Sequence, residues 1–276
     1  RLDKIFWGDS SVWRKDGERL LESLVNAQTP EKGKKLLISE EKIVLPRIFA
    51  EQKGRAGHQP YLLGSHLAEL KRVALNQNYG GISVFIVFRR QDHWLASRYA
   101  QSSGVIKGAS QAHFEREVRR LIDRDYHSIG CQLAYDRMWK TLVEAIGQEN
   151  VYMIPYEALV WNPEHFVQKM LRFFGELTVQ HIPLATQNGS NNVRRQSDDV
   201  WSLRPYHRTI EMPYFMRGIA GGREQIYASH NKNDQSIHLS GSLSNEIKSA
   251  YEDANCNIAS ILGEDLKRYG YYPEQC

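Results

Sequence analysis

An arginine and a serine follow one strongly apolar segment at a spacing suited to holding an anion. The run ISVFIVF, residues 82–88, is continuous and β-branched, which is typical of a strand buried on both faces. Arg89 follows it directly, and a helix expected to start near Asp92 carries Ser97. Ligands of open α/β sheets bind at the carboxyl ends of the strands. A guanidinium, a hydroxyl and the free amides of a helix N-terminus together suit a phosphate group.

The same residues also allow a purely structural interpretation. Arg89 could pair with a surface carboxylate, and Ser97 could simply face solvent. The physical features of this segment alone do not choose between the two interpretations.

Arg89 is followed by Ser97 and Tyr99 at a spacing that resembles a known motif. In sulfotransferases that use 3′-phosphoadenosine 5′-phosphosulfate (PAPS), this motif binds the 3′-phosphate of the donor. After the arginine, Arg90-Gln91 replaces the commoner Asn-Pro, a variant that resembles the bacterial branch of that family.

Two later segments resemble the same family and follow in the same order. YEALVWNPEHFVQKMLRFFG, residues 156–175, is similar to a Tyr-Glu-x-Leu…Asn-Pro segment that leads into a helix. NCNIASILGEDLKRYGY, residues 255–271, resembles the closing segment of bacterial members. The resemblance therefore covers residues 84–271 through three separate motifs.

The resemblance implies a P-loop nucleotide-hydrolase-like sulfotransferase fold and a transferase activity. PAPS would be the sulfate donor, adenosine 3′,5′-bisphosphate the product, and no metal would be needed. The sulfuryl group would pass to a hydroxyl or amine of a small-molecule, glycan or peptide acceptor. As in phosphoryl transfer, the protein mainly positions the reactants and neutralises charge on the leaving group.

A base must also take the proton of the acceptor. ISEEKIVLPRIF, residues 38–49, is similar to a segment of the tyrosylprotein branch in which a glutamate is the catalytic base. The comparison makes Glu41 the first candidate and Glu40 the second, against a solvated, capped helix start as the alternative. His58 and His66 are further candidate bases, and both also fit structural or loop roles.

An irregular insert is expected at about residues 183–233, which are rich in Asn, Arg, Gly and Ser. Such a stretch is a binding loop, a lid or a disordered segment. Arg194 and Arg195 could cover the nucleotide or meet an acidic acceptor, and they also fit a solvated basic pair. Asn188 and Ser190 loosely resemble an Asn-x-Ser found in some members of the family.

The loop that holds the 5′-phosphosulfate in the family, of the type Pro-Lys-Ser-Gly-Thr-Thr, does not occur in this sequence. Lys4 and Lys15 are the lysines near the start, and neither lies in a Gly/Ser/Thr loop. In the family that loop would precede a segment resembling RLDKIFWGDSSVWR. We therefore expect Arg1 to begin after the loop, and the chain as given to bind nucleotide weakly and to transfer little sulfate.

The elements that position these residues follow from the alternation of strand-like and helical patterns. It predicts βαβ units, and hence a single α/β domain over residues 1–276 with a central, mostly parallel sheet flanked by helices. Strands are expected at residues 36–38, 82–88 and 151–154. Helices are expected after Asp16, over residues 67–76, from Asp92, over residues 133–146, from Asn162-Pro163 to Gly175, and over about residues 244–262 with a stop at Gly263.

Composition limits the remaining choices. The 276 residues are 41% hydrophobic and carry a net charge of +4, which fits an anionic ligand but is too weak to indicate nucleic acid. Three scattered cysteines indicate a reducing, cytoplasmic location, and no run is long enough for a transmembrane segment. Two alternatives to the enzyme stay open: a non-catalytic nucleotide-binding module, and a protein that binds polyanions or carbohydrates.

Overall fold

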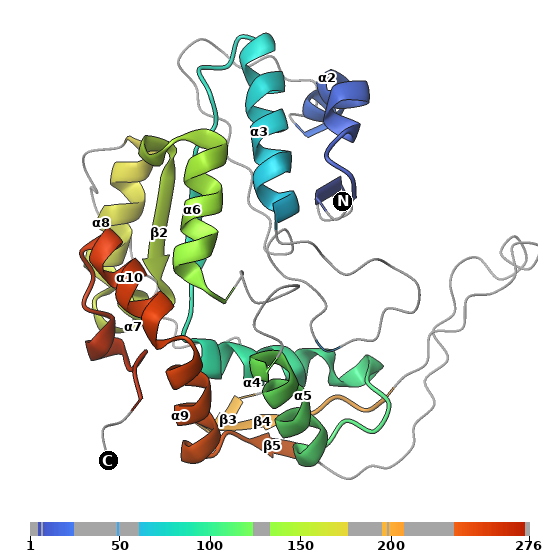
Figure 1. Cartoon of the computed structure of the whole chain (residues 1–276), viewed down its shortest axis with the longest axis vertical. Coiled ribbons are helices and arrows are strands. Elements are labelled where there is room, and N and C mark those ends of the chain that lie inside the picture. The colour runs from blue at the N-terminus through green and yellow to red at the C-terminus, as the bar shows by residue number, and fades with distance from the viewer. Residues whose placement is uncertain are drawn as a thin grey trace, which may run out of the picture.

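The computed structural model describes residues 5–6, 8–24, 49, 61–123, 133–175, 195–197, 199–206 and 235–273. Two hydrophobic clusters organise these residues, one around a parallel strand pair and one around a small antiparallel sheet. Figure 1 shows the first cluster's elements in the upper part of the molecule and the second cluster's elements below them. The described structure is mostly helical and broadly α/β.

Two parallel strands lie at the centre of the first cluster. β1 (Val84–Phe88) pairs with β2 (Val151–Pro155) along its whole length. The predicted strands at residues 82–88 and 151–154 are therefore confirmed, with slightly different ends. The strand expected at residues 36–38 lies outside the described residues.

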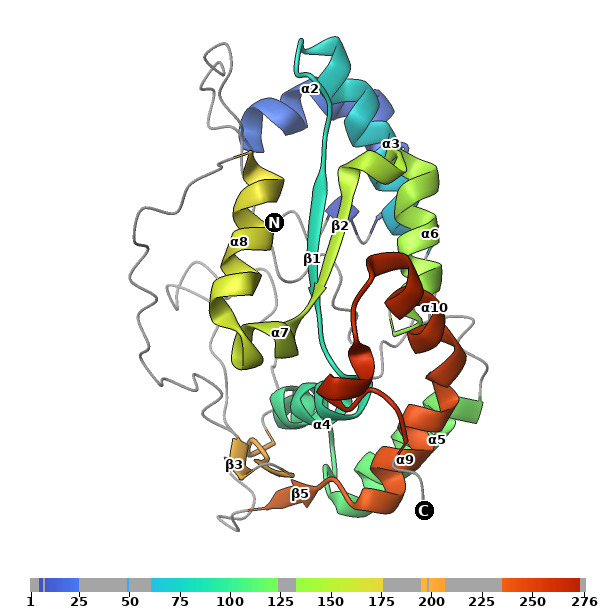
Figure 2. The same cartoon turned by 90° about the vertical axis from the view of Figure 1, so that its left-hand side faces the viewer.

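Helices lie on both faces of the strand pair (Figure 2). α3 (Tyr61–Asn76) and α6 (Tyr135–Ile146) pack against one another on one side, where Ile86 and Met153 are buried. α8 (Pro163–Phe174) lies on the other side, as the aromatic contacts of its last turn show.

The second face of the strand pair is less completely buried than the sequence predicts. The rings of Phe85 and Tyr152 have centroids 5.2 and 4.6 Å from that of Phe173 in α8. Val87, on the same face, is nevertheless 45% exposed, and Tyr152 is 43% exposed. A continuous apolar run therefore marks the strand correctly without being buried on both faces.

The ends of α8 follow local signals in the sequence. The side chain of Asn162 accepts a hydrogen bond from the His165 amide at 3.0 Å, and Pro163 occupies the first helical position. Gly175 ends the helix with φ 76°, a left-handed conformation that favours glycine. The predicted helix that begins at Asn162-Pro163 and stops at Gly175 is confirmed.

The first helices begin earlier than predicted. α2 (Val12–Leu24) already includes Asp16, which lies at a kink with φ −130° and ψ 16° rather than at the helix start. α3 begins six residues before residue 67, the predicted start. Apolar periodicity located both helices, but it did not locate their first turns.

The second cluster contains helices and the antiparallel sheet. Its largest fully buried side chains include Trp201, Tyr99 and Phe114. The surrounding elements are α4 (Gln91–Ser102), η1 (Ser103–Val105), α5 (Gln111–Asp123), α9 (Gly241–Ala250), and the strands β3 (Arg195–Ser197), β4 (Val200–Ser202) and β5 (Ser236–His238).

Strands β3 and β4 fall inside the insert that was expected to be irregular. β4 pairs antiparallel with β3 and with β5, and Trp201 in β4 is fully buried. The expectation of irregular structure over residues 183–233 is therefore wrong for the strands, because one tryptophan anchors them in the second cluster. Most of the remaining insert lies outside the described residues.

The final helix is divided in two. α9 ends before Tyr251, which has φ −110° and ψ 7°, and α10 (Glu252–Leu262) follows. Tyr251 is buried in the second cluster, whereas Ile258 is buried in the first. The break thus lets the chain pass from one cluster to the other, and a single helix over residues 244–262 is wrong. The predicted stop at Gly263 is confirmed by its left-handed φ of 62°.

Three short elements complete the description. η3 (Gln148–Asn150) precedes β2, α7 (Tyr156–Trp161) follows it, and η5 (Leu266–Tyr269) follows α10. Each helix in the described part of the chain falls short of the length and apolarity that crossing a bilayer requires.

The contact between α3 and α6 gives a test of the fold. A Cβ on Gly64 would lie 2.7 Å from Thr141 Cγ2 and 3.2 Å from the Thr141 carbonyl oxygen. We expect Gly64→Ala to lower the free energy of unfolding by about 1 kcal/mol or more, although alanine favours an isolated helix by about the same amount. Urea denaturation measures the change.

Gly241→Ala is the matched control for this substitution. Gly241 begins α9, and a Cβ there would meet nothing within 4 Å. This variant should be as stable as the parent or slightly more stable. A stabilising Gly64→Ala would contradict the close packing of α3 on α6.

Candidate functional site

The carboxyl ends of β1 and β2 meet at one edge of the sheet. Phe88 lies opposite Pro155 in the parallel register, so Arg89 and Tyr156 follow at neighbouring positions. α4 and α7 begin at this edge, below the strands in Figure 2. The prediction that Arg89 ends a strand and that a helix begins within a few residues of Asp92 is confirmed.

The guanidinium of Arg89 has a donor nitrogen without a hydrogen-bond partner among the described residues. Its guanidinium carbon lies 5.2 Å from the ring centroid of Tyr156, a cation–π contact. Its Nε is buried and has no hydrogen-bond partner among the described residues. Buried donors are normally satisfied, so this guanidinium nitrogen is a donor that still lacks an acceptor among the described residues.

Arg90, in contrast, is committed to the protein. Its Nε and one terminal nitrogen donate to the two carboxylate oxygens of Asp92, at 3.1 and 2.6 Å. Asp92 is 1% exposed and also accepts a hydrogen bond from the Ser244 hydroxyl at 2.7 Å. Burial alone would raise the pKa of Asp92, but the hydrogen bonds and charge of Arg90 hold it below its usual value. This ion pair ties the start of α4 to α9.

Glu157 is a second buried carboxylate at the same edge. One oxygen accepts the Arg90 backbone N–H at 3.2 Å, and the other accepts the Tyr271 hydroxyl at 2.7 Å. Burial raises the pKa of Glu157 above its usual value, although these hydrogen bonds and the charge of Arg89 oppose the shift. The carboxyl group therefore lies close enough to Arg89 for the arginine charge to act on the pKa of Glu157.

The amides at the start of α4 are less available than the sequence suggests. The Arg90 N–H is taken by Glu157, and the His93 N–H donates to Asp92 at 2.7 Å. The expectation that free helix amides help to hold a phosphate is therefore wrong for these two groups. Of the groups described so far at this edge, the Arg89 guanidinium is the one cation that could hold an anion.

Two further residues of the 89–99 motif are buried on α4. Ser97 is 8% exposed and lies about 9 Å along the helix axis from Gln91. The hydroxyl of Tyr99 accepts the Ser110 N–H at 3.1 Å and lies 3.0 Å from His113 Nδ1, within the second cluster. Tyr99 thus has a structural role, while Ser97 stays a candidate ligand.

The closing segment of the chain reaches the same edge. Gln91 Nε2 donates to Asn255 Oδ1 at 2.8 Å, and Asn255 Nδ2 donates to the Tyr271 carbonyl at 3.1 Å. The Tyr135 hydroxyl donates to the Arg89 carbonyl. All four side chains of this network are buried or nearly so, and burial raises the pKa of both tyrosines.

The tertiary structure therefore brings together three segments that are far apart in sequence. Residues 156–157 contact Arg89 and Arg90, and residues 255–271 contact Gln91 and Glu157. These belong to the three motifs that resemble one family. Glu157, Tyr156 and Tyr271 were not among the predicted site residues, although the rule that parallel strands end at one edge already applied to Tyr156 and Glu157.

Most of the other predicted site residues fall outside the part of the chain that the structure describes. Glu40, Glu41, Arg194 and His58 lie outside the described residues, and the side chain of Arg195 in β3 is not described either.

His66 is structural. Its Nδ1 accepts the Trp13 indole N–H at 2.8 Å, and its Nε2 lies 3.1 Å from the Gly8 carbonyl, so both ring nitrogens have partners. Burial lowers the pKa of His66, which is 0% exposed. A buried ring with both nitrogens engaged cannot take a proton from a bound acceptor, so His66 is excluded as the base.

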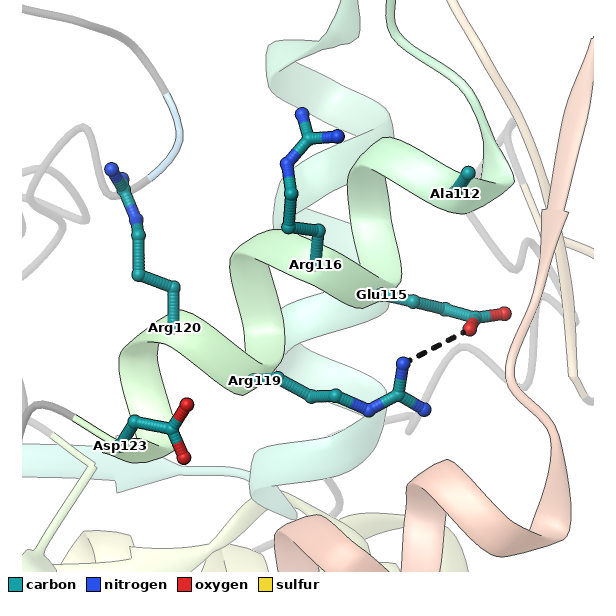
Figure 3. A pocket seen from close by; sticks show the side chains of 6 residues that line it. All are labelled: Ala112, Glu115, Arg116, Arg119, Arg120 and Asp123. Atoms are coloured by element: carbon teal, nitrogen blue, oxygen red, sulfur yellow. Dashed lines mark hydrogen bonds and ion pairs between the residues drawn. The ribbon is translucent and has the colours of Figure 1, made fainter.

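A shallow hollow lies over α5 (Figure 3), but it has few features of a ligand site. Its lining residues all come from this one helix: Ala112, Glu115, Arg116, Arg119, Arg120 and Asp123. Arg119 contacts Glu115 and Glu246, and Arg120 contacts Glu117 at 2.6 Å. We interpret the hollow as a solvated, charged helix face. Groups of three His, Cys, Asp or Glu able to hold a metal do not occur among the described residues.

No family model, no curated protein and no solved structure matches this chain. The interpretation of the site therefore depends on its own geometry and on the motifs in the sequence.

The buried ion pair at this edge can be tested by Asp92→Asn. Removing one partner leaves the Arg90 charge without compensation, so we expect a loss of about 2–4 kcal/mol in the free energy of unfolding. The full cost of a buried pair is not expected, because the Arg90 side chain is 21% exposed. Asp253→Asn, at an exposed position in the first turn of α10, is the control and should change stability little.

The stability difference between the parent and Asp92→Asn should also depend on pH. Because the folded pKa of Asp92 lies below the usual value of about 3.9, its stabilisation is present above that pH. It should be lost only as the pH falls through the folded pKa. Equal stability of Asp92→Asn and the parent protein at neutral pH would contradict this assignment.

Proposed function

We propose that this chain binds the 3′-phosphate of an adenosine nucleotide at Arg89, as part of a PAPS-dependent sulfotransferase. The observation that carries the proposal is the buried Nε of Arg89, which lacks a partner in the described part of the chain, at the carboxyl edge of a parallel strand pair. The meeting of all three family-like segments around this arginine supports it. The fold that the proposal implies is P-loop-like, with β1 and β2 as two of its parallel strands.

The residues present fit one end of such a nucleotide. Among the described residues Arg89 has no carboxylate ion-pair partner, whereas Arg90 is held by Asp92. Ser97, on the helix that follows, would add a hydroxyl to the 3′-phosphate. The Tyr156 ring is 40% exposed and would flank the same position. Adenosine 3′,5′-bisphosphate, the product of the reaction, would bind through the same groups.

The reaction itself requires one base and one acceptor. In sulfuryl transfer the acceptor oxygen or nitrogen forms a bond to sulfur while the bond from sulfur to the bridging phosphate oxygen breaks. The acceptor's proton must go to a base, for which Glu41 is proposed first and Glu40 second. Arg194 and Arg195 would cover the nucleotide or meet an acidic acceptor. The acceptor class stays broad: a small molecule, a glycan or a peptide.

Nucleotide binding is the direct test. Adenosine 3′,5′-bisphosphate should bind more tightly than adenosine 5′-monophosphate, because only the former has a 3′-phosphate for Arg89. Arg89→Ala should weaken binding of the bisphosphate by about one to two decades and abolish the preference, since a charge-assisted contact contributes about 1.5–3 kcal/mol. Isothermal titration calorimetry measures both constants.

Arg172→Ala is the matched control, because Arg172 is an exposed residue in the last turn of α8. It should leave the affinity unchanged apart from a small, salt-dependent effect. An unchanged preference for the 3′-phosphate in Arg89→Ala would remove Arg89 from the site. Binding to acidic glycans that ignores the bisphosphate would instead favour a polyanion-binding protein.

Transfer is tested with labelled PAPS and a panel of sugars, tyrosyl peptides and small alcohols. We expect turnover only in a protein that also supplies a phosphosulfate loop, because removing even one transition-state donor costs about 10²–10³ in rate. In that protein Glu41→Gln should reduce turnover far more than nucleotide affinity. Tight nucleotide binding without transfer to any acceptor would indicate a non-catalytic module.

A further inference from the structure

Glu157 places a negative charge inside the site that is proposed to bind an anion. Its carboxylate is held from two sides, by the Arg90 backbone N–H and by the Tyr271 hydroxyl, and the charge of Arg89 acts to lower its pKa. In the free protein this carboxylate offsets the Arg89 charge, which has the Tyr156 ring as its other described contact.

A phosphate dianion at Arg89 changes that balance. Two further negative charges would then lie near the Glu157 carboxylate in a partly buried environment, where like charges at about 5 Å repel by several kcal/mol at an effective dielectric constant of about 20. Protonation of Glu157 removes this repulsion without moving any backbone. Burial raises the pKa of Glu157, which lowers the free energy that this protonation requires.

We propose that Glu157 is the built-in counter-anion of Arg89, and that binding of a phosphate dianion there is coupled to uptake of one proton by Glu157. This inference rests on the proposed function, because it places the phosphate at Arg89. It adds that the affinity of the site depends on pH. Affinity for the dianion should rise as the pH falls toward the range in which Glu157 protonates.

The other titratable and charged groups around Glu157 do not provide this response. Arg89 and Arg90 stay protonated at all relevant pH values. Tyr135, Tyr269 and Tyr271 interact with Glu157, and burial raises the pKa of each, so they stay neutral. Asp92 faces Arg90, whose charge and hydrogen bonds keep Asp92 ionised. Among the described groups facing Glu157, the glutamate itself is therefore the one that can change charge.

His93 is another ionisable side chain at the start of α4. Its ring lies against Trp201, with centroids 5.7 Å apart, and its Nε2 is 3.7 Å from Asp199. Because its backbone N–H contacts Asp92, proton uptake by this histidine must be separated from uptake by Glu157. The variant His93→Gln makes that separation.

The experiment is calorimetric titration of the purified chain with adenosine 3′,5′-bisphosphate at about pH 5.5, 6.5 and 7.5. Two buffers of different ionisation enthalpy give the number of protons taken up. Protonation of the ligand itself is common to all variants and cancels when variants are compared. Glu157→Gln keeps an acceptor oxygen for the Arg90 N–H, and Glu18→Gln, at an exposed position of α2, is the control for the loss of one carboxylate.

We expect Glu157→Gln to bind the bisphosphate about tenfold more tightly than the parent at about pH 7.5, with the gain shrinking toward about pH 5.5. The proton uptake that accompanies binding in the parent should be absent in Glu157→Gln, whereas Glu18→Gln and His93→Gln should retain it. Tyr271→Phe removes a hydrogen bond that favours ionised Glu157, so it should shift the pH dependence of binding upward. This second variant retains the carboxyl group and tests the inference even if Glu157→Gln does not fold.

Two different failures can be distinguished. If Arg89→Ala loses binding but Glu157→Gln has unchanged or weaker affinity and unchanged proton uptake, the counter-anion role is overturned and the nucleotide site stands. Loss of proton uptake in His93→Gln alone would assign the uptake to the histidine and overturn the inference. If neither the parent nor Glu157→Gln binds the bisphosphate at any of these pH values, the proposed function and the inference both fail.

Discussion

The parallel register of β1 and β2 decides which side chains share the candidate site. Because Phe88 lies opposite Pro155, the residues that follow the two strands leave the sheet at the same edge. Arg89 then contacts the Tyr156 ring, and the Arg90 backbone reaches Glu157. A shift of this register by one residue would move the alternate side chains to the opposite face and separate these groups. The pairing of two short apolar strands thus holds the charged groups in place.

The charges at this edge are arranged as two arginines and two buried carboxylates. Asp92 satisfies Arg90 with a two-point ion pair, which leaves Arg89 with an aromatic ring and a more distant carboxylate. Isolated buried charges are costly, so the near-balance of the four groups keeps the edge stable without a ligand. The two arginines therefore differ in role. Arg90 is structural, whereas Arg89 retains a donor that lacks a partner among the described residues.

The closing part of the chain contributes as much to this edge as the strands do. Tyr251 breaks the final helical region so that α9 packs in the second cluster and α10 in the first. This path lets Ser244 reach Asp92 while Asn255 and Tyr271 reach Gln91 and Glu157. The two hydrophobic clusters are therefore joined at the start of α4, where the candidate site lies.

Short stretches of residues were enough to predict the local features of this protein. The β-branched runs at residues 82–88 and 151–154, the cap at Asn162 and the stops at Gly175 and Gly263 depend on near neighbours, and each was predicted from its own few residues. The position of Arg89 at a strand end followed from the same short-range patterns.

The tertiary structure decided the rest, because the decisive contacts join distant residues. Glu157 and Tyr271 are 114 positions apart, and Gln91 and Asn255 are 164 apart, so local pattern does not show that they meet. Only the folded chain shows that carboxylates accept from the Arg90 and His93 amides, that both nitrogens of His66 are engaged, and that the last helical region breaks at Tyr251. Burial and long-range pairing set these outcomes, and both are properties of the packed molecule rather than of any one segment.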